Sequence, residues 1–161
     1  MSPRRALTTL LCLVGLSFGP AAPARALEIT AFLSTGSPSE VWGSGVGAAL
    51  TSTLFKIVML DAELARQGYE TGDGRLLSFS AAACLAPTIG PLTPYAGFAV
   101  GVQRQTLNEF GGNGTLKSVL GGVKLKLGLL VVRAEYRTFE LSGTPLLDLD
   151  HRIYAGAGIS F

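Results

Sequence analysis

His151 is the only histidine of the chain, and it lies among residues that could form a catalytic triad. Asp150 directly precedes it, Asp148 lies three residues before it, and Ser142 begins the same segment. A histidine that takes a proton from a serine, and is oriented by an acid, activates that serine for hydrolysis. The same residues also fit a hydrated loop with a histidine at its rim. We favour the loop, and we predict no catalytic residues.

Two further patterns look like binding sites but lack the spacing that such sites need. The segment Gly43-Ser-Gly-Val-Gly47 has neither the GxGxxG spacing nor the βαβ context of a nucleotide-binding loop. Glu70, Asp73, Asp148 and Asp150 could bind divalent cations that bridge lipopolysaccharide, but we favour ordinary solvated loops. We therefore predict no metal site, no cofactor and no cofactor-binding residues.

The charged residues that recur at every second position form the most extensive candidate site. Arg133, Glu135 and Arg137 alternate with apolar residues, and this period of two is that of side chains on one face of a β-strand. The complete set comprises Asp61, Glu63, Lys124, Lys126, Arg133, Glu135, Arg137 and Arg152. If these faces meet, the set forms a network of opposite charges.

Eight strand-like segments would position these charges. They cover residues 27–35, 41–51, 55–66, 75–86, 92–105, 115–127, 129–141 and 151–161. Each segment has about the length that a tilted strand needs to cross a bilayer. The prolines within residues 76–103 argue against a membrane helix there, because proline breaks helices.

The connections between these segments alternate between long and short. The expected long loops cover residues 36–40, 67–74, 106–114 and 142–150, and the expected tight turns cover 52–54, 87–91 and 127–129. This alternation is typical of an up-and-down outer-membrane barrel, with long loops outside and short turns in the periplasm. With eight strands, both termini would lie on the periplasmic side.

The strands without charge decide which face points inward. Segment 41–51 and the interior of segment 75–86 have polar faces of glycine, serine and alanine, which suit a narrow lumen better than a surface in water. A soluble lipocalin-like barrel would instead bury its apolar face. We predict an all-β fold, an eight-stranded antiparallel up-and-down transmembrane β-barrel, with a soluble ligand-binding barrel as the alternative.

The charged face would then line the lumen, which eight strands make just wide enough for side chains to fill. Three acids and five bases belong to the set, so buried charges can pair, with loop acids or water for the surplus bases. The expected pairings join Glu135 to Arg133, Arg137 or Arg152, and Asp61 or Glu63 to a lysine. We interpret the network as structural packing; a gated or narrow ion path is the alternative.

Small and aromatic residues complete the expected barrel. Glycines that share a strand face are expected to make room for large inward side chains such as Tyr95 or Tyr154. These glycines are Gly43, Gly45 and Gly47, and Gly156 and Gly158. Outward aromatic residues that could lie at the membrane interfaces are Trp42, Tyr136 and Phe161.

The N-terminus has the layout of a secretory signal peptide. Arg4 and Arg5 precede an apolar run, and Ala24-Arg-Ala26 is an A-x-A cleavage site. We predict that residues 1–26 are removed and that residues 27–161 form one domain. Ten basic and eleven acidic side chains would remain, so the mature net charge is about −1 and nothing favours nucleic-acid binding. Cys84 would be the only cysteine, which excludes an intramolecular disulfide.

The last segment, residues 151–161, alternates and ends on an aromatic residue. It resembles the closing strand of bacterial outer-membrane barrels, and the chain is similar in pattern to the small OmpA/OmpX-type barrel family. The resemblance implies a C-terminal assembly signal formed by Tyr154, Ile159 and Phe161. Some small barrels are lipid A deacylases, but their pattern has a serine two residues after the histidine, where Ile153 stands here.

Together these patterns predict an exported, monomeric barrel of the bacterial outer membrane with a structural or surface-interaction role and no enzymatic activity. The expected partners are outer-membrane lipid, lipopolysaccharide and, through the C-terminal strand, the barrel-assembly machinery. The alternatives are a lipid A-modifying membrane enzyme and a small pore.

Overall fold

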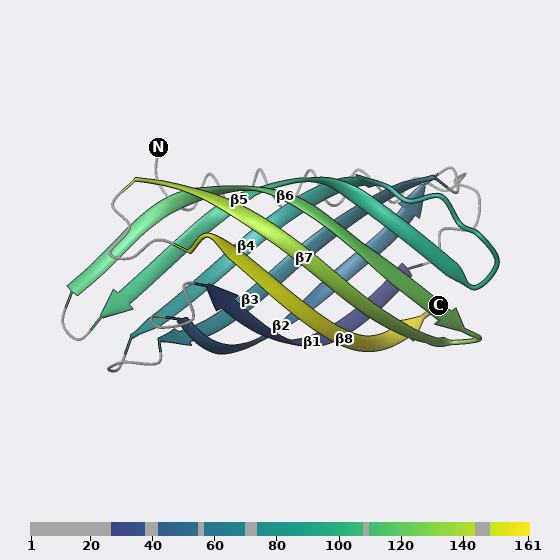
Figure 1. Cartoon of the computed structure of the whole chain (residues 1–161), viewed down its shortest axis with the longest axis horizontal. Coiled ribbons are helices and arrows are strands. Elements are labelled where there is room, and N and C mark those ends of the chain that lie inside the picture. The colour runs from purple at the N-terminus through teal and green to yellow at the C-terminus, as the bar shows by residue number, and fades with distance from the viewer. Residues whose placement is uncertain (1–26, 38–41, 55–56, 70–73, 108–109, 144–148) are drawn as a thin grey trace.

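The computed structural model describes residues 27–37, 42–54, 57–69, 74–107, 110–143 and 149–161, and these form a closed antiparallel barrel (Figure 1). Its strands are β1 (Leu27–Ser37), β2 (Trp42–Leu54), β3 (Val58–Tyr69), β4 (Arg75–Leu85), β5 (Leu92–Leu107), β6 (Phe110–Leu127), β7 (Leu130–Gly143) and β8 (His151–Ser160). Each strand pairs with its neighbours in the chain, and β8 returns to pair with β1. The predicted fold class is confirmed.

The two ends of the barrel differ in which strand ends and connections lie there. The start of β1 and the end of β8 meet at one end, on the right of Figure 1, where Glu28 lies opposite Ser160. We call this the terminal end, and the opposite end the loop end. Because consecutive strands are antiparallel, the β2–β3, β4–β5 and β6–β7 connections also lie at the terminal end.

Burial alternates along every strand, as the sequence pattern predicts. In β4, each inward residue is buried and each outward residue is exposed over the whole of Arg75–Leu85. A single sheet closed on itself has an inner and an outer face, and successive side chains point to opposite faces. None of the described residues forms a helix of the length and apolarity needed to cross a membrane.

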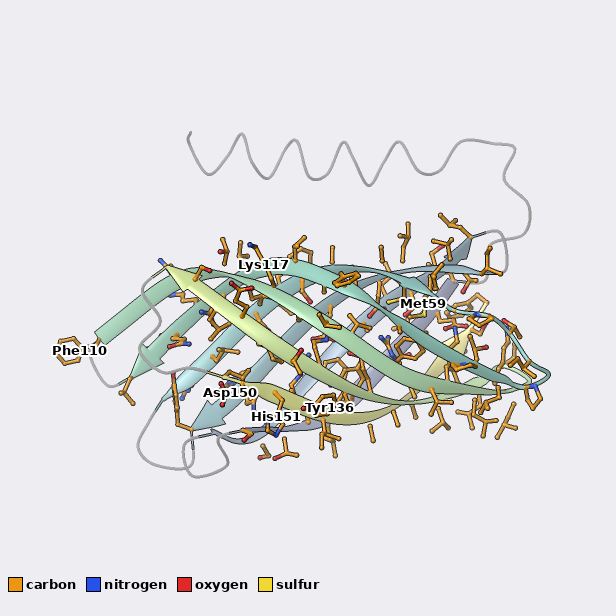
Figure 2. All side chains as sticks on the ribbon, turned by 45° about the horizontal axis from the view of Figure 1, so that its top comes forward. Met59, Phe110, Lys117, Tyr136, Asp150 and His151 are labelled. Carbon is orange, nitrogen blue, oxygen red and sulfur yellow. The ribbon has the colours of Figure 1, made fainter. Side chains whose placement is uncertain are left out.

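The predicted long loop over residues 106–114 is wrong. Strand β6 already begins at Phe110, which pairs with Leu107, and the ladder with β5 runs through the glycine-rich segment. Glycine and asparagine are turn-forming residues, but glycine also tolerates extended backbone, so pairing with β5 overrides the local preference. Pairing between β6 and β7 starts only at Gly114 and Gly143, and the β5–β6 hairpin projects at the loop end with Phe110 at its tip (Figure 2).

The turn predicted over residues 52–54 is also displaced. Strand β2 continues to Leu54, which pairs with Val58, so the connection to β3 moves beyond it. The Ser-Thr composition there suggests a turn, yet β-branched threonine is favourable in strands. The β6–β7 turn lies where expected, and Gly128 has a φ of 65°, which a two-residue hairpin favours at its first central position.

Candidate functional site

The structure places seven of the eight predicted network residues inside the barrel. They are at most 5% exposed and come from β3, β6, β7 and β8. These residues are Asp61, Glu63, Lys124, Arg133, Glu135, Arg137 and Arg152. A buried charge is stable only with a partner and further hydrogen bonds, so their contacts decide what the site does.

Arg133 makes the most polar contacts of any member of the network. Its guanidinium binds both carboxylate oxygens of Asp61, with Nη2–Oδ2 at 2.9 Å and Nη1–Oδ1 at 3.1 Å. The same Nη2 lies 2.6 Å from Oε2 of Glu135. Its Nε donates to the Tyr95 hydroxyl at 2.6 Å, and that hydroxyl donates in turn to Glu135 at 2.9 Å. This planar, forked recognition of carboxylates is the geometry that arginine provides and lysine does not.

The network continues from Glu135 toward the loop end through two more arginines. Nη2 of Arg137 lies 2.7 Å from Oε1 of Glu135 and 3.1 Å from Oε2 of Glu63. Arg152 forms an ion pair with the other oxygen of Glu63. The result is an unbroken chain of alternating charges, Asp61–Arg133–Glu135–Arg137–Glu63–Arg152, which joins β3 to β7 and β8 across the lumen.

The sequence analysis missed one acid, Glu28. It is buried on the inner face of β1, and its Oε2 lies 2.8 Å from Nζ of Lys124. The expected pairing of Asp61 or Glu63 with a lysine is therefore wrong, because both acids bind arginines. The alternation in β1 could have revealed Glu28, since it shares a face with the inward Thr30.

Lys126 is the one predicted member that does not join the ion pairs. It is exposed at the terminal end, where its Nζ donates to Oγ of Ser160 at 2.7 Å. With Lys126 left out and Glu28 added, the network contains four acids and four bases, instead of the expected three acids and five bases. Among the described residues, the bases of the network therefore need no loop acids or water to balance their charge.

The Glu28–Lys124 pair allows a direct test of how these buried charges act. Lys124→Met should lower the free energy of unfolding by about 3 kcal/mol, because it leaves the Glu28 carboxylate buried without its cation. The double variant Glu28→Gln/Lys124→Met should regain most of that loss, because no charge is then left unpaired. Urea unfolding in lipid vesicles, followed by gel mobility, measures both. Equal destabilisation by the single and double variants would contradict this account.

Aromatic rings pack against the luminal charges. Tyr154 stacks on Phe32 with ring centroids 4.4 Å apart, and the guanidinium of Arg152 lies 5.6 Å from the centroid of the Phe32 ring. A Cβ at Gly47 would collide with the Phe32 ring, and one at Gly122 would collide with the Tyr95 hydroxyl. Glycines do make room for large inward side chains, but Gly47 does so for Phe32 rather than for Tyr95 or Tyr154.

An apolar cluster that the sequence analysis did not predict lies in the lumen near the loop end. Tyr69, Leu76 and Leu149 are buried together, with partly buried Phe139 packed against them. Leu149 lies just before β8, and its side chain is buried in this cluster. The signal that could have found it is the leucine-rich composition of residues 146–149.

The residues considered for catalysis do not converge. His151 pairs with Thr138 on β7, and Ser142 lies four residues further along that strand, roughly 13 Å away. The His151 ring instead lies 5.7 Å from the Tyr136 ring on the outer flank of the barrel (Figure 2). Asp148 lies outside the described residues. No group of three or more histidine, cysteine, aspartate or glutamate side chains in the described ranges could hold a metal ion.

The remaining predicted residues divide between the two faces. Tyr154 is buried in the lumen, whereas Ile159 and Phe161 point outward and are 51% and 71% exposed. Tyr136 also points outward, and the side chain of Trp42 is not among those described. The proposed signal peptide, residues 1–26, lies outside the described residues. The assembly signal formed by Tyr154, Ile159 and Phe161 stays a prediction.

The outer face of the barrel is apolar over most of its height. Exposed leucine, isoleucine, valine and phenylalanine side chains occur on every strand, for example Leu33, Leu64 and Phe98. Soluble proteins rarely expose apolar patches of more than a few hundred Å². Charges inside and apolar side chains outside are the arrangement of a transmembrane barrel. This excludes the soluble ligand-binding barrel.

Known structures have the same architecture as this barrel. No protein-family model matches the sequence, and no curated protein matches it significantly. Neisserial surface protein A is 17% identical with a TM-score of 0.66, covering 87% of this chain and 97% of its own. The N-terminal β-barrel domain of Pseudomonas aeruginosa OprF is 18% identical with a TM-score of 0.59, covering 84% and 97%.

A third similar structure is Ail, the attachment invasion locus protein of Yersinia pestis. It is 16% identical with a TM-score of 0.55, and the match covers 88% of this chain and 100% of Ail. At these identities the likeness establishes the fold. The chain therefore has the fold of the small OmpA/OmpX-type outer-membrane barrels.

Proposed function

We propose that this chain is a monomeric, non-enzymatic outer-membrane barrel with a side-chain-filled lumen and a structural or surface-interaction role. The observation that carries the proposal is the continuous ion-pair chain from Asp61 to Arg152 across the lumen. Among the described residues, each charged member of this chain has an oppositely charged partner within the chain, although Arg152 Nε is buried without a hydrogen-bond partner. A network of this kind rigidifies a barrel but does not provide chemistry.

Apolar side chains on both sides of the network support the same proposal over a small pore. Toward the terminal end, Met59, Cys84 and Leu120 belong to one buried luminal cluster. Toward the loop end, the cluster with Tyr69 and Leu149 occupies the lumen. An ion crossing the barrel would have to lose its hydration beside these side chains, which is unfavourable.

Planar-bilayer recording tests lumen closure. The refolded protein is expected to show no steady conductance steps. The variant Glu135→Ala/Arg137→Ala removes the centre of the network but keeps the apolar clusters on both sides of it, so it should also stay closed. Conductance of this variant alone would show that the charge network is the barrier to ions. Thr138→Ala, on the outward face of the same strand, is the matched control and should stay closed. Steady conductance of the unaltered protein would favour the pore instead.

The loop end supports a surface-interaction role. The β5–β6 hairpin extends beyond the pairing with β7 and presents Phe110, which is 72% exposed. The names of two similar structures, a surface protein and an attachment protein, point to the same class of role. We further propose export through the signal peptide and assembly through the C-terminal strand, whose Phe161 and Ile159 point outward to contact the assembly machinery.

A further inference from the structure

Four exposed bases lie on the outer face of four consecutive strands, toward the loop end. The outward faces of β3, β4, β5 and β6 are apolar from the terminal end upward, and near the loop end each carries one exposed base. We call these four residues the basic half-ring: Arg66, Arg75, Arg104 and Lys117. Directly below them, Leu64, Phe79 and Val102 are exposed on the first three strands.

The other half of the circumference has no such bases among its described residues. At the corresponding outward positions, β1 and β2 carry Ser37 and Ser44, and β7 and β8 carry Glu140 and His151. The half-ring is therefore confined to one side of the barrel. A general requirement for solubility would not produce this asymmetry.

The half-ring bases take no part in the ion pairs among the described residues, all of which lie in the lumen. Lys117 lies opposite Glu140 on the ladder, so the three arginines carry the larger unbalanced charge. An unpaired charge on the lipid-facing side of a barrel is unfavourable near the bilayer centre and tolerated at the interface. The three arginines thus mark the interface at the loop end, where an anion would stabilise them.

The ladder register brings the three arginines within reach of one ligand. Arg66 and Arg104 both lie opposite Leu77, one strand to either side of it, which separates their backbones by roughly 10 Å. Arg75 lies on the strand between them, two residues closer to the loop end. Arginine side chains are long enough to converge over this distance, and guanidinium groups bind phosphate through two parallel hydrogen bonds.

A groove on the outer surface lies between two of these arginines. It has a volume of about 330 Å³. It is lined by Arg66 and Gly68 on β3, by Gly74 and Arg75 at the start of β4, and by Ser44, Gly45 and Val46 on β2. A Cβ at Gly68 would meet no heavy atom closer than 3.9 Å, so the absence of a side chain there leaves open space. The groove lies closer to the loop end than the exposed Leu64 on β3.

We propose that the basic half-ring binds the phosphate groups of a phosphorylated glycolipid in the leaflet at the loop end. The proposal rests on the membrane orientation given under the proposed function. Phosphate chemistry follows from the clustered guanidinium groups, and a lipid source follows from Leu64, Phe79 and Val102 directly beneath, which offer acyl chains an apolar surface. A second groove of about 430 Å³ continues this surface beside Lys117. Its lining includes Phe98, Val100 and Val119, together with Lys117 and Glu140.

Binding of bis-phosphorylated lipid A to the refolded mature chain in detergent, measured by native mass spectrometry, tests the proposal. The triple variant Arg66→Gln/Arg75→Gln/Arg104→Gln should bind at least tenfold more weakly, and Gly68→Leu, which fills the groove, should also weaken binding. Lys126→Gln is the matched control, because it removes an exposed base at the terminal end and should leave binding unchanged. Raised salt should weaken binding of the unaltered protein.

Three outcomes would overturn the proposal. The first is that dephosphorylated lipid A binds as tightly as bis-phosphorylated lipid A. The second is that free inorganic phosphate competes for the site as well as the lipid does. The third is that Lys126→Gln loses as much binding as the triple arginine variant. Gel mobility of unheated and heated samples is recorded for every variant. A mobility shift without lipid binding refutes the half-ring alone, whereas the absence of a shift in the unaltered protein refutes the membrane barrel on which it rests.

Discussion

Replacing Arg133 with methionine should lower the free energy of unfolding by about 3–5 kcal/mol. Arg133 neutralises Asp61 through two hydrogen bonds and also contacts Glu135 and Tyr95. The variant would leave the Asp61 carboxylate buried with only the Thr51 hydroxyl as a partner among the described residues. Urea unfolding in lipid vesicles, followed by circular dichroism and gel mobility, measures the loss.

The double variant Asp61→Leu/Arg133→Met separates a buried-charge effect from a packing effect. It removes one acid and one base, and Glu135 keeps its pairing with Arg137. Most of the lost stability should therefore return, because paired buried charges contribute little net stability over apolar residues. If the double variant is as unstable as Arg133→Met, packing of the guanidinium against Tyr95 and Tyr154 is the dominant effect.

Replacing Gly158 with valine should prevent closure of the barrel. Gly158 pairs with Thr30, and a Cβ at this position would collide with the backbone oxygen of Ile29 and lie 2.7 Å from Cα of Thr30. Backbone atoms do not move aside as a flexible side chain would, so β8 and β1 would have to separate. The compact form that migrates faster before heating should be lost or strongly reduced on a gel.

Two further variants define how much of this effect comes from close approach. Gly158→Ala adds only the Cβ and should already destabilise the barrel. Gly68→Ala adds the same atom on the outer face, where its nearest heavy atom would be 3.9 Å away, and should fold as the unaltered protein does. Normal folding of Gly158→Ala would show that the β1–β8 seam is more tolerant than its geometry indicates.

The strands were predictable because their signal is local. Alternation within β4 and β7 assigns each residue to one face without reference to any other strand, and the structure confirms this along both strands. Strand ends were less predictable, because pairing with a neighbour can extend a strand through residues that favour turns. The glycine-rich start of β6 is extended in this way by its pairing with β5.

The partners within the lumen were predictable only in part. Glu135 was expected to pair with Arg133, Arg137 or Arg152. The first two lie two residues from Glu135 on the same strand face, which places them close to it without further information, and both pair with it. Arg152 pairs with Glu63 instead. Glu28 and Lys124 are 96 residues apart, and their contact depends on the height of β1 relative to β6 around the barrel. No pattern along a single strand specifies the height of β1 relative to β6.

The sequence by itself determined the number of strands, their alternating faces and the apolar outer surface, since each depends on neighbouring residues along the chain. Only the tertiary structure decided which charges pair, that Lys126 lies outside the network, and that four bases align on one flank. The physical reason is closure: the stagger between the first and last strands sets the relative height of every side chain, and that stagger is a property of the whole ring.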